Sequence, residues 1–269
     1  MPLLEVNDQP LDVMDRGTGD PVLFLHAFPL RAAMWEYQFE ALESGYRCLA
    51  VDLPGFGGSP PFERPEDSSM SGWADLVAGV LEQLDVPAAT VVGCSMGGYL
   101  AMALLRDHPD RVGRLVLADT RARSDDAATV SRRTDQQTQV RSGTEVGSLA
   151  KALIESLLSS ASMAREDLVS YVHALADGAS PGGWIGALEA MKGRPDSMRV
   201  LREATLPALV VVGELDRLTP IAEALSLRSL LKGELVVIPN VGHLPSLEDP
   251  ISFNEALSGF LGSSEPPGP

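Results

Sequence analysis

A serine flanked by two glycines is the first candidate for chemistry in this sequence. Ser95 lies between Gly93 and Gly97, after an apolar run and before a helix-forming stretch. This context predicts a nucleophile elbow, in which the chain leaves a strand, turns tightly and enters a helix with the serine at the apex. The amino end of that helix favours negative charge. The alternative interpretation is a glycine-rich turn with an incidental serine.

The neighbouring cysteine is a second, less favoured candidate nucleophile. If the side chain of Ser95 points out of the sheet, the side chain of Cys94 points into it. The other cysteine, Cys48, lies in the apolar stretch Tyr46–Val51. We therefore expect both cysteines to be small, buried apolar residues.

The base that a serine nucleophile needs is predicted by elimination among four histidines. His26 ends a predicted strand and enters a loop, His108 ends a predicted helix, and His173 lies among apolar helical residues. His243 remains, in a loop after the predicted strand that ends at Pro239. Because the serine also follows a strand, both groups belong at the carboxyl edge of the sheet. We predict that His243 is the general base.

The acid partner of this histidine is predicted in the loop after another strand. A carboxylate fixes the tautomer of the histidine and stabilises the imidazolium that forms. Asp216 follows the predicted strand Pro207–Gly213, with enough intervening chain to turn back toward His243. It is favoured over Glu214 on that ground. Asp119, after the strand that follows the elbow helix, is its main rival.

Two backbone amides are candidates to stabilise an oxyanion. The amide of Met96 is the first of the elbow helix, and the amide of Phe28 follows a predicted strand next to that of the elbow. We also predict that His26, Trp184 and Leu218 line the substrate pocket. The alternative position for Trp184 is the core.

The elements that must position these residues follow from apolar runs that alternate with helical patterns. Six runs are predicted to be buried strands: Pro21–Ala27, Tyr46–Asp52, Ala89–Gly93, Val112–Asp119, Pro207–Gly213 and Glu234–Pro239. Helical patterns lie near Ala32–Glu43, Met70–Leu84, Met96–His108, Ile221–Lys232 and Ile251–Leu261. Continuous apolar character, rather than alternation, indicates a sheet covered on both faces. The order strand, helix, strand, helix predicts a parallel α/β sheet.

One interval lacks convincing strands and divides the predicted core. Residues 124–195 contain four helical stretches: Thr129–Val140, Val146–Leu158, Glu166–Ala176 and Gly183–Met191. We predict an all-helical cap over the carboxyl edge of the sheet, inserted into a core formed by residues 1–123 and 196–262. A hairpin is predicted from Leu3–Val6 and Leu11–Asp15, and residues 263–269 are predicted to be a disordered tail.

The composition restricts the partners of the protein. In 269 residues, 37 acidic side chains against 21 basic ones give a net charge of −16. Such a surface disfavours binding to nucleic acid and to anionic membranes. No signal peptide or membrane span is apparent, so we expect a cytoplasmic protein. The glycine-rich loop Asp52–Ser59 lacks the pattern of a phosphate-binding loop and is predicted to be a rigid turn.

Five motifs together resemble the α/β-hydrolase superfamily. They are HAFPL at His26–Leu30, DLPGFGGS at Asp52–Ser59, GCSMGG at Gly93–Gly98, GELDRLTP at Gly213–Pro220 and VGHLPSLEDP at Val241–Pro250. The order serine, acid, histidine is the one found in that superfamily. The resemblance implies an eight-stranded, mostly parallel twisted sheet flanked by helices, with a helical cap after the sixth strand. It also implies covalent acyl-enzyme catalysis without cofactor or metal. Within the superfamily the chain resembles 3-oxoadipate enol-lactone hydrolases and related carboxylesterases, although Ala27 stands where many members have glycine.

These observations predict a serine hydrolase that cleaves a small carboxylic ester or lactone. Two alternatives use the same residues: a cofactor-free perhydrolase or haloperoxidase-type enzyme, and a thioesterase. An alternative of another class is a non-catalytic, hydrolase-like ligand-binding protein. A substrate that carries a carboxylate would need a cation in the pocket, for which Arg121, Arg123 and Arg217 are candidates. Each of these arginines is equally compatible with a solvated loop.

Overall fold

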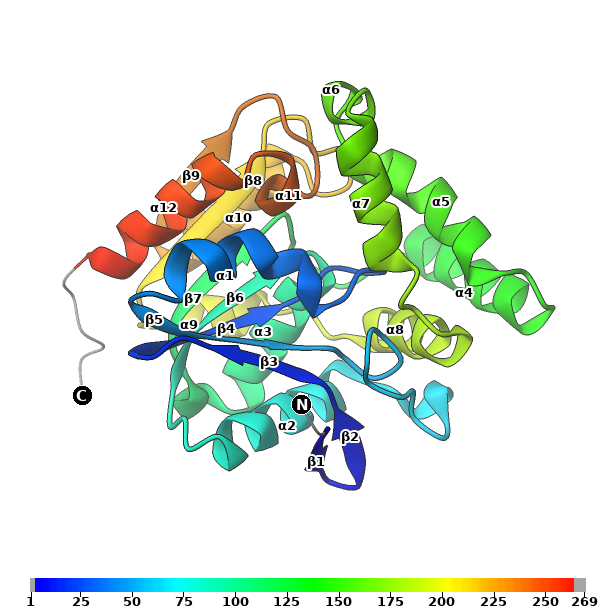
Figure 1. Ribbon diagram of the computed structural model, residues 1–269, viewed down its shortest axis with the longest axis horizontal. Coiled ribbons are helices and arrows are strands. Elements are labelled where there is room, and N and C mark those ends of the chain that lie inside the picture. The colour runs from blue at the N-terminus through cyan, green and yellow to red at the C-terminus, as the bar shows by residue number, and fades with distance from the viewer. Residues whose placement is uncertain (1–2, 264–269) are drawn as a thin grey trace.

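A seven-stranded, mostly parallel sheet forms the centre of the molecule (Figure 1). The computed structural model describes residues 3–263. The strands of this sheet are β3 (Val13–Arg16), β4 (Asp20–Leu25), β5 (Tyr46–Val51), β6 (Ala89–Cys94), β7 (Val112–Ala118), β8 (Ala208–Gly213) and β9 (Glu234–Ile238). Their order is β3-β5-β4-β6-β7-β8-β9, with β3 antiparallel to β5 and the other pairs parallel. The six predicted strands correspond to β4 through β9, which confirms the α/β class.

The expectation of eight strands in one sheet is wrong by one strand. The first two strands, β1 (Leu4–Val6) and β2 (Gln9–Leu11), form a separate antiparallel hairpin. The chain bends away at Asp12, whose amide donates to the Ser59 hydroxyl and whose carbonyl accepts from the amide of Asp52. The predicted second arm of the hairpin is therefore divided between β2 and β3.

Helices cover both faces of the sheet, which is why its central strands are mostly apolar and buried at their carboxyl ends. All six residues of β8 are buried. In Figure 1, α1 (Glu36–Leu42) and α12 (Pro250–Gly262) lie together on the near face, and α2 (Met70–Gln83) and α3 (Met96–Asp107) lie together on the other. The helices α9 (Met198–Glu203) and α10 (Ile221–Leu231) pack beside α3 and β8. Four short helical elements also lie outside the inserted region: η1 (Ala32–Trp35), η2 (Pro65–Asp67), η3 (Pro109–Arg111) and α11 (Pro245–Glu248).

Five helices follow β7 in the chain before α9 and β8. They are α4 (Ala127–Arg141), α5 (Val146–Leu157), α6 (Ser160–Met163), α7 (Glu166–Ala176) and α8 (Pro181–Gly193). Side chains cap several of them, because Asp126, Ser159 and Ser180 accept hydrogen bonds from amides in the first turns. The four predicted helical stretches correspond to α4, α5, α7 and α8. The single turn of α6 is too short for a periodic pattern and was not predicted. In Figure 1, α4 to α7 project from one end of the sheet.

The glycine-rich loop of residues 52–59 connects the core to α8. A Cβ atom on Gly55 would lie 2.2 Å from Cα of Gly183, at the start of α8. The carboxylate of Asp52 accepts hydrogen bonds from the amides of Ala32 and Gly58. The loop is thus a rigid turn at a close contact between backbones, as its sequence predicts.

No helix in residues 3–263 is long and apolar enough to cross a membrane. The predicted disordered tail lies outside the described residues, apart from Ser263.

Candidate active site

The turn from β6 into α3 holds Ser95 in a strained conformation. Its φ and ψ angles are 54° and −111°, a region that residues other than glycine rarely adopt. The Ser95 amide donates to the carbonyl of Ala118, and its carbonyl accepts from the hydroxyl of Thr120. Both glycines of the motif are required by space, because a Cβ on Gly93 would lie 2.3 Å from the carbonyl oxygen of Gly97. The turn therefore has the geometry of a nucleophile elbow.

Ser95, His243 and Asp216 form a chain of hydrogen bonds. The Oγ atom of Ser95 lies 2.8 Å from Nε2 of His243, and Nδ1 of His243 lies 2.8 Å from Oδ2 of Asp216. His243 is 2% exposed and Asp216 is 5% exposed, so solvent does not compete for these bonds. With Nδ1 protonated toward Asp216, Nε2 is free to accept the hydroxyl proton of the serine.

The loop after β8 stabilises Asp216 as a carboxylate. Burial alone would raise the pKa of Asp216, but the charge and hydrogen bond of His243, together with hydrogen bonds from Thr219 and Leu218, lower it well below its usual range. The Thr219 hydroxyl donates to Oδ2 at 2.6 Å, and the Leu218 amide donates to Oδ1 at 2.8 Å. Asp216 is therefore ionised at neutral pH.

The rival acid, Asp119, is also buried beside the histidine, but it is in a different state. Its Oδ1 atom accepts from the amide of Gly213, while its Oδ2 atom has no hydrogen-bond partner among residues 3–263. Burial, followed by the negative charge of Asp216, raises the pKa of Asp119 well above its usual range. The shift favours the protonated form of Asp119 beside an ionised Asp216, and it is Asp216 that hydrogen-bonds to His243.

The two predicted oxyanion donors, the amides of Met96 and Phe28, belong to backbone segments that lie next to each other. A Cβ on Gly97 would lie 2.0 Å from the carbonyl oxygen of Leu25 and 2.9 Å from that of His26. The first turn of α3, which begins at Met96, is thus pressed against the end of β4, from which the chain continues to Phe28. Neither the Met96 nor the Phe28 amide is engaged in a hydrogen bond within the part of the chain that the structure describes.

A cavity of about 200 Å³ opens directly onto Ser95 and His243. Phe28 and Leu218 line it, and Leu218 thus lies where the sequence predicts. The inserted helices contribute the apolar residues Leu153, Leu157 and Met191 and the basic residues Arg132 and Arg133 to its lining. A third arginine, Arg121, comes from the loop after β7. The cavity therefore lies between the carboxyl ends of the strands and the inserted helices.

Two residues predicted to line the pocket do not line this cavity. The His26 ring is fully buried, where its Nε2 atom accepts from the amide of Leu53 and burial lowers its pKa to about 4. The Trp184 ring is also fully buried and packs against Phe28, with ring centroids 4.5 Å apart. His26 is therefore a neutral structural residue, and Trp184 supports the cavity wall from behind.

The cysteine of the elbow is buried, as predicted. The Cys94 thiol points to the carbonyl oxygen of His243, and burial raises its pKa well above its usual range. Burial also raises the pKa of Cys48, to about 12. Neither thiol is an ionised nucleophile at neutral pH.

One important residue was missed by the sequence analysis. The side chain of Glu248, 4% exposed, accepts hydrogen bonds from the amides of Gly242 and Leu244, on both sides of His243, and from the amide of Ser159 after α5. The amide of His243 itself donates to the carbonyl of Leu157. Glu248 thus joins the histidine loop to the inserted helices.

The same groups include a geometrically possible metal site. One ligand atom each from Asp119, Asp216 and His243 lies within 4.8 Å of the others. Nδ1 of His243 and Oδ2 of Asp216 already bond to each other, an arrangement that suits proton transfer rather than metal ligation. That the protein works without metal or cofactor stays a prediction.

Comparison with known proteins agrees with this geometry. A family model described as α/β hydrolase fold matches residues 20–250. The chain belongs to the α/β-hydrolase fold family. This membership confirms the resemblance found in the motifs.

Several members of the α/β-hydrolase family resemble nearly the whole chain. A pimeloyl-(acyl-carrier protein) methyl ester esterase of Aeromonas hydrophila is 31% identical over 258 residues, which cover 91% of this chain and 97% of the relative. A thermophilic esterase from Thermogutta terrifontis, solved with malate bound, is 34% identical with a TM-score of 0.90, covering 94% of this chain and 93% of that one. An enol-lactonase from Burkholderia xenovorans shares the fold at 23% identity, with a TM-score of 0.88 and coverage of 97% and 99%.

Proposed function

We propose that this protein is a serine hydrolase that cleaves small carboxylic esters or lactones through an acyl-enzyme intermediate. The observation that carries the proposal is the hydrogen-bonded chain from Ser95 through His243 to Asp216, with both links at 2.8 Å. The esterase relatives at 31% and 34% identity support an ester as the substrate.

In this proposal, each residue has one chemical role. Oγ of Ser95 attacks the carbonyl carbon while Nε2 of His243 takes its proton, and the carbonyl oxygen becomes an oxyanion. The amides of Met96 and Phe28 hold that oxyanion. The alcohol leaves with the proton from Nε2, and an acyl group remains on Ser95. Water, deprotonated by the same nitrogen, then attacks the acyl carbon, and the acid is released as its bond to Oγ breaks and Oγ takes the proton back from Nε2. Asp216 stabilises the imidazolium at both stages.

We also propose that residues 124–195 act as a cap that shapes the substrate site. The support for this role is that α4, α5 and α8 all contribute lining residues to the cavity above the serine. A cavity of about 200 Å³ suits a short acyl chain.

Hydrolysis of p-nitrophenyl butyrate tests the proposal. We expect Ser95→Ala to lower kcat/KM by about 10⁴-fold or more, because it removes the nucleophile. A fluorophosphonate should phosphonylate Ser95 with loss of fluoride, so the wild type should gain the mass of the phosphonyl group and Ser95→Ala should not. Cys94→Ala is the matched control, and it should retain both turnover and labelling.

Other outcomes would identify one of the alternatives. A folded protein that binds the ester without turnover, and that is not labelled, would be a hydrolase-like binding protein. Peracid formation from acetate and hydrogen peroxide, at a rate above that of ester hydrolysis, would indicate a perhydrolase. A preference for the matched thioester would indicate a thioesterase.

A further inference from the structure

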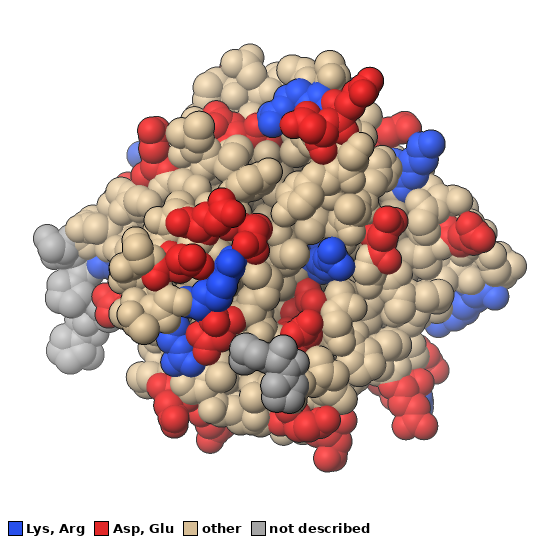
Figure 2. All heavy atoms as spheres, viewed as in Figure 1, with Lys and Arg blue, Asp and Glu red and all other residues tan. Residues whose placement is uncertain are grey.

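The charge of the cavity is opposite to that of the protein. The chain has a net charge of −16, and acidic side chains are spread over the face shown in Figure 2. Within the described residues, however, the cavity that contains Ser95 is lined by three arginines and by no aspartate or glutamate. Arg121 follows β7, and Arg132 and Arg133 belong to α4. A local excess of positive charge in the cavity of an acidic protein favours the binding of an anion there.

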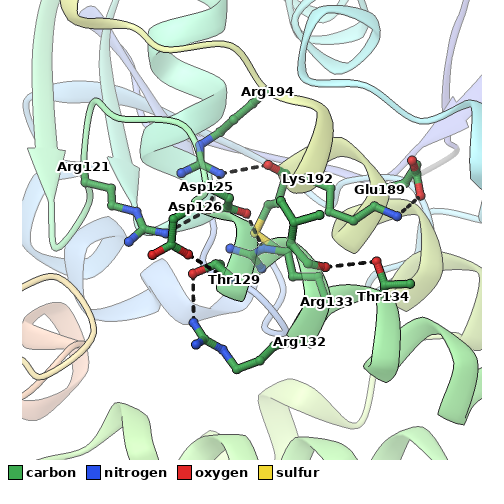
Figure 3. A network of polar contacts seen from close by, with 12 residues as sticks. Arg121, Asp125, Asp126, Thr129, Arg132, Arg133, Thr134, Glu189, Lys192 and Arg194 are labelled. Carbon is green, nitrogen blue, oxygen red and sulfur yellow. Dashed lines mark hydrogen bonds and ion pairs between the residues drawn. The ribbon is translucent and has the colours of Figure 1, made fainter.

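One buried carboxylate holds most of this cluster together. The side chain of Asp125, 0% exposed, pairs with Arg121 at 2.8 Å, Arg133 at 2.6 Å and Arg194 at 2.8 Å (Figure 3). The Arg194 guanidinium also stacks 3.7 Å from the centroid of the Tyr99 ring, which itself lines the cavity. Because one carboxylate bonds to three guanidinium groups, this network has a net positive charge. The carboxylate also fixes the network in place before any ligand binds.

Two groups in the cluster retain unused hydrogen-bond capacity. The Nε atom of Arg121 is buried without a hydrogen-bond partner among residues 3–263. Arg132, an exposed residue that lines the cavity, donates to the Thr129 hydroxyl at 2.9 Å and forms no ion pair with any described residue. Asp126, the N-cap of its helix, is exposed and accepts from the amide of Thr129, and Asp135, three residues after Arg132, is exposed and forms no ion pair among the described residues. The guanidinium of Arg132 is therefore available to an anion in the cavity.

We propose that the substrate carries a carboxylate at the end remote from its reacting carbonyl, and that Arg132 and Arg121 bind this carboxylate. The inference rests on the proposed function, since it names the substrate class of the same site. Leu153, Leu157 and Met191 lie along the same cavity, where they contact the apolar chain between the two ends of the substrate. Of the three arginines predicted as candidates, only Arg121 lines the cavity, whereas Arg123 and Arg217 are exposed elsewhere.

A matched pair of methyl esters tests the proposal. Monomethyl adipate and methyl hexanoate have the same chain length and differ by a terminal carboxylate in place of a methyl group. We expect wild-type kcat/KM for the anionic ester to exceed that for the neutral ester by about 10- to 100-fold, the range of one or two charge-assisted hydrogen bonds. The preference should decrease as NaCl is added, because Arg132 is open to solvent.

Variants of the arginines test whether the preference for the anionic ester depends on these side chains. We expect Arg132→Gln to lower the ratio of the two kcat/KM values by about tenfold, chiefly through the KM of the anionic ester. Arg132 has no ion pair among the described residues, so this variant should fold like the wild type. Arg121→Gln should lower the ratio as well. Arg123→Gln, an exposed arginine that does not line the cavity, is the matched control and should leave the ratio unchanged.

Calorimetry with the Ser95→Ala variant separates this inference from the proposed function. Binding of monomethyl adipate without binding of methyl hexanoate would support the carboxylate site even if the wild type hydrolysed neither ester. Hydrolysis of both esters at equal rates, or a ratio unaffected by Arg132→Gln, would overturn the carboxylate site and leave the serine hydrolase intact. The absence of turnover with either ester would count against the proposed function alone.

Discussion

Thr219 shows how a single hydroxyl supports the proposed catalytic acid. Its Oγ1 atom donates to Oδ2 of Asp216 at 2.6 Å and lies 3.4 Å from Nδ1 of His243. Its amide also bonds to Oδ1 of Asp216. The hydroxyl therefore helps to orient the carboxylate that in turn orients the histidine. Because Thr219 acts through Asp216, we regard it as a positioning residue.

We expect Thr219→Val to lower kcat for p-nitrophenyl butyrate by about tenfold, with little change in KM. The substitution keeps the shape of the side chain but removes a hydrogen bond worth about 1.4 kcal/mol to the charged acid. Thr219→Ser retains a hydroxyl and should restore most of the activity. Equal activities for the valine and serine variants would show that the hydroxyl has no role.

Among the elements of the fold, the short helix α11 connects the histidine loop to the end of α5. Its last residue, Glu248, collects three amides from two chain segments, and those amides have no other acceptor among the described residues. A Cβ on Gly242 would lie 2.7 Å from the amide nitrogen of Ser159. The histidine loop and the end of α5 are thus in backbone contact, with Glu248 between them.

We expect Glu248→Ala to lower the free energy of unfolding by about 3 kcal/mol or more and to reduce kcat. It leaves three buried amides without an acceptor, and each unsatisfied group costs about 1–3 kcal/mol. Urea unfolding measures the first effect and ester hydrolysis the second. Glu214→Ala is the matched control, because Glu214 is exposed and accepts from the single amide of Asn240. If both variants lose the same stability, Glu248 does not tie the two segments together.

For the molecule as a whole, the raised pKa of Asp119 affects how stability depends on pH. Its pKa is raised in the folded protein by burial and by the charge of Asp216, whereas in the unfolded chain it is ordinary, near 3.8. Above that pH the folded state keeps a proton that the unfolded state has lost. This term therefore lowers stability as pH rises, until the folded group also ionises.

We expect Asp119→Asn to gain stability relative to the wild type as pH rises from 5 to 8. An amide cannot ionise, has the same shape and can still accept from Gly213, so the variant lacks the proton-linked loss. The free energy of unfolding of the variant, relative to that of the wild type, should increase by about 1.4 kcal/mol per pH unit until Asp119 ionises in the folded wild type. Urea unfolding at several pH values measures it, with the exposed Asp135→Asn as control. Parallel stability curves would mean that Asp119 is ionised in the folded state.

Local sequence patterns are enough to predict the elements and most of the candidate chemistry. Apolar periodicity and turn residues are local signals, so six strands, four inserted helices and the tight turn at Ser95 could be predicted from neighbouring residues. His243 could be reached by elimination, because only four histidines compete for the role.

Which of these residues come into contact, and how their pKa values shift, depends on tertiary packing. Ser95 and His243 are 148 positions apart, and the order of strands across the sheet brings them together. The same packing buries His26 and Trp184 away from the cavity, raises the pKa of Asp119 while lowering that of Asp216, and brings Arg132 and Arg133 into the lining of the cavity that contains the serine. Burial and proximity depend on segments distant in the chain, and a local pattern carries no information about them.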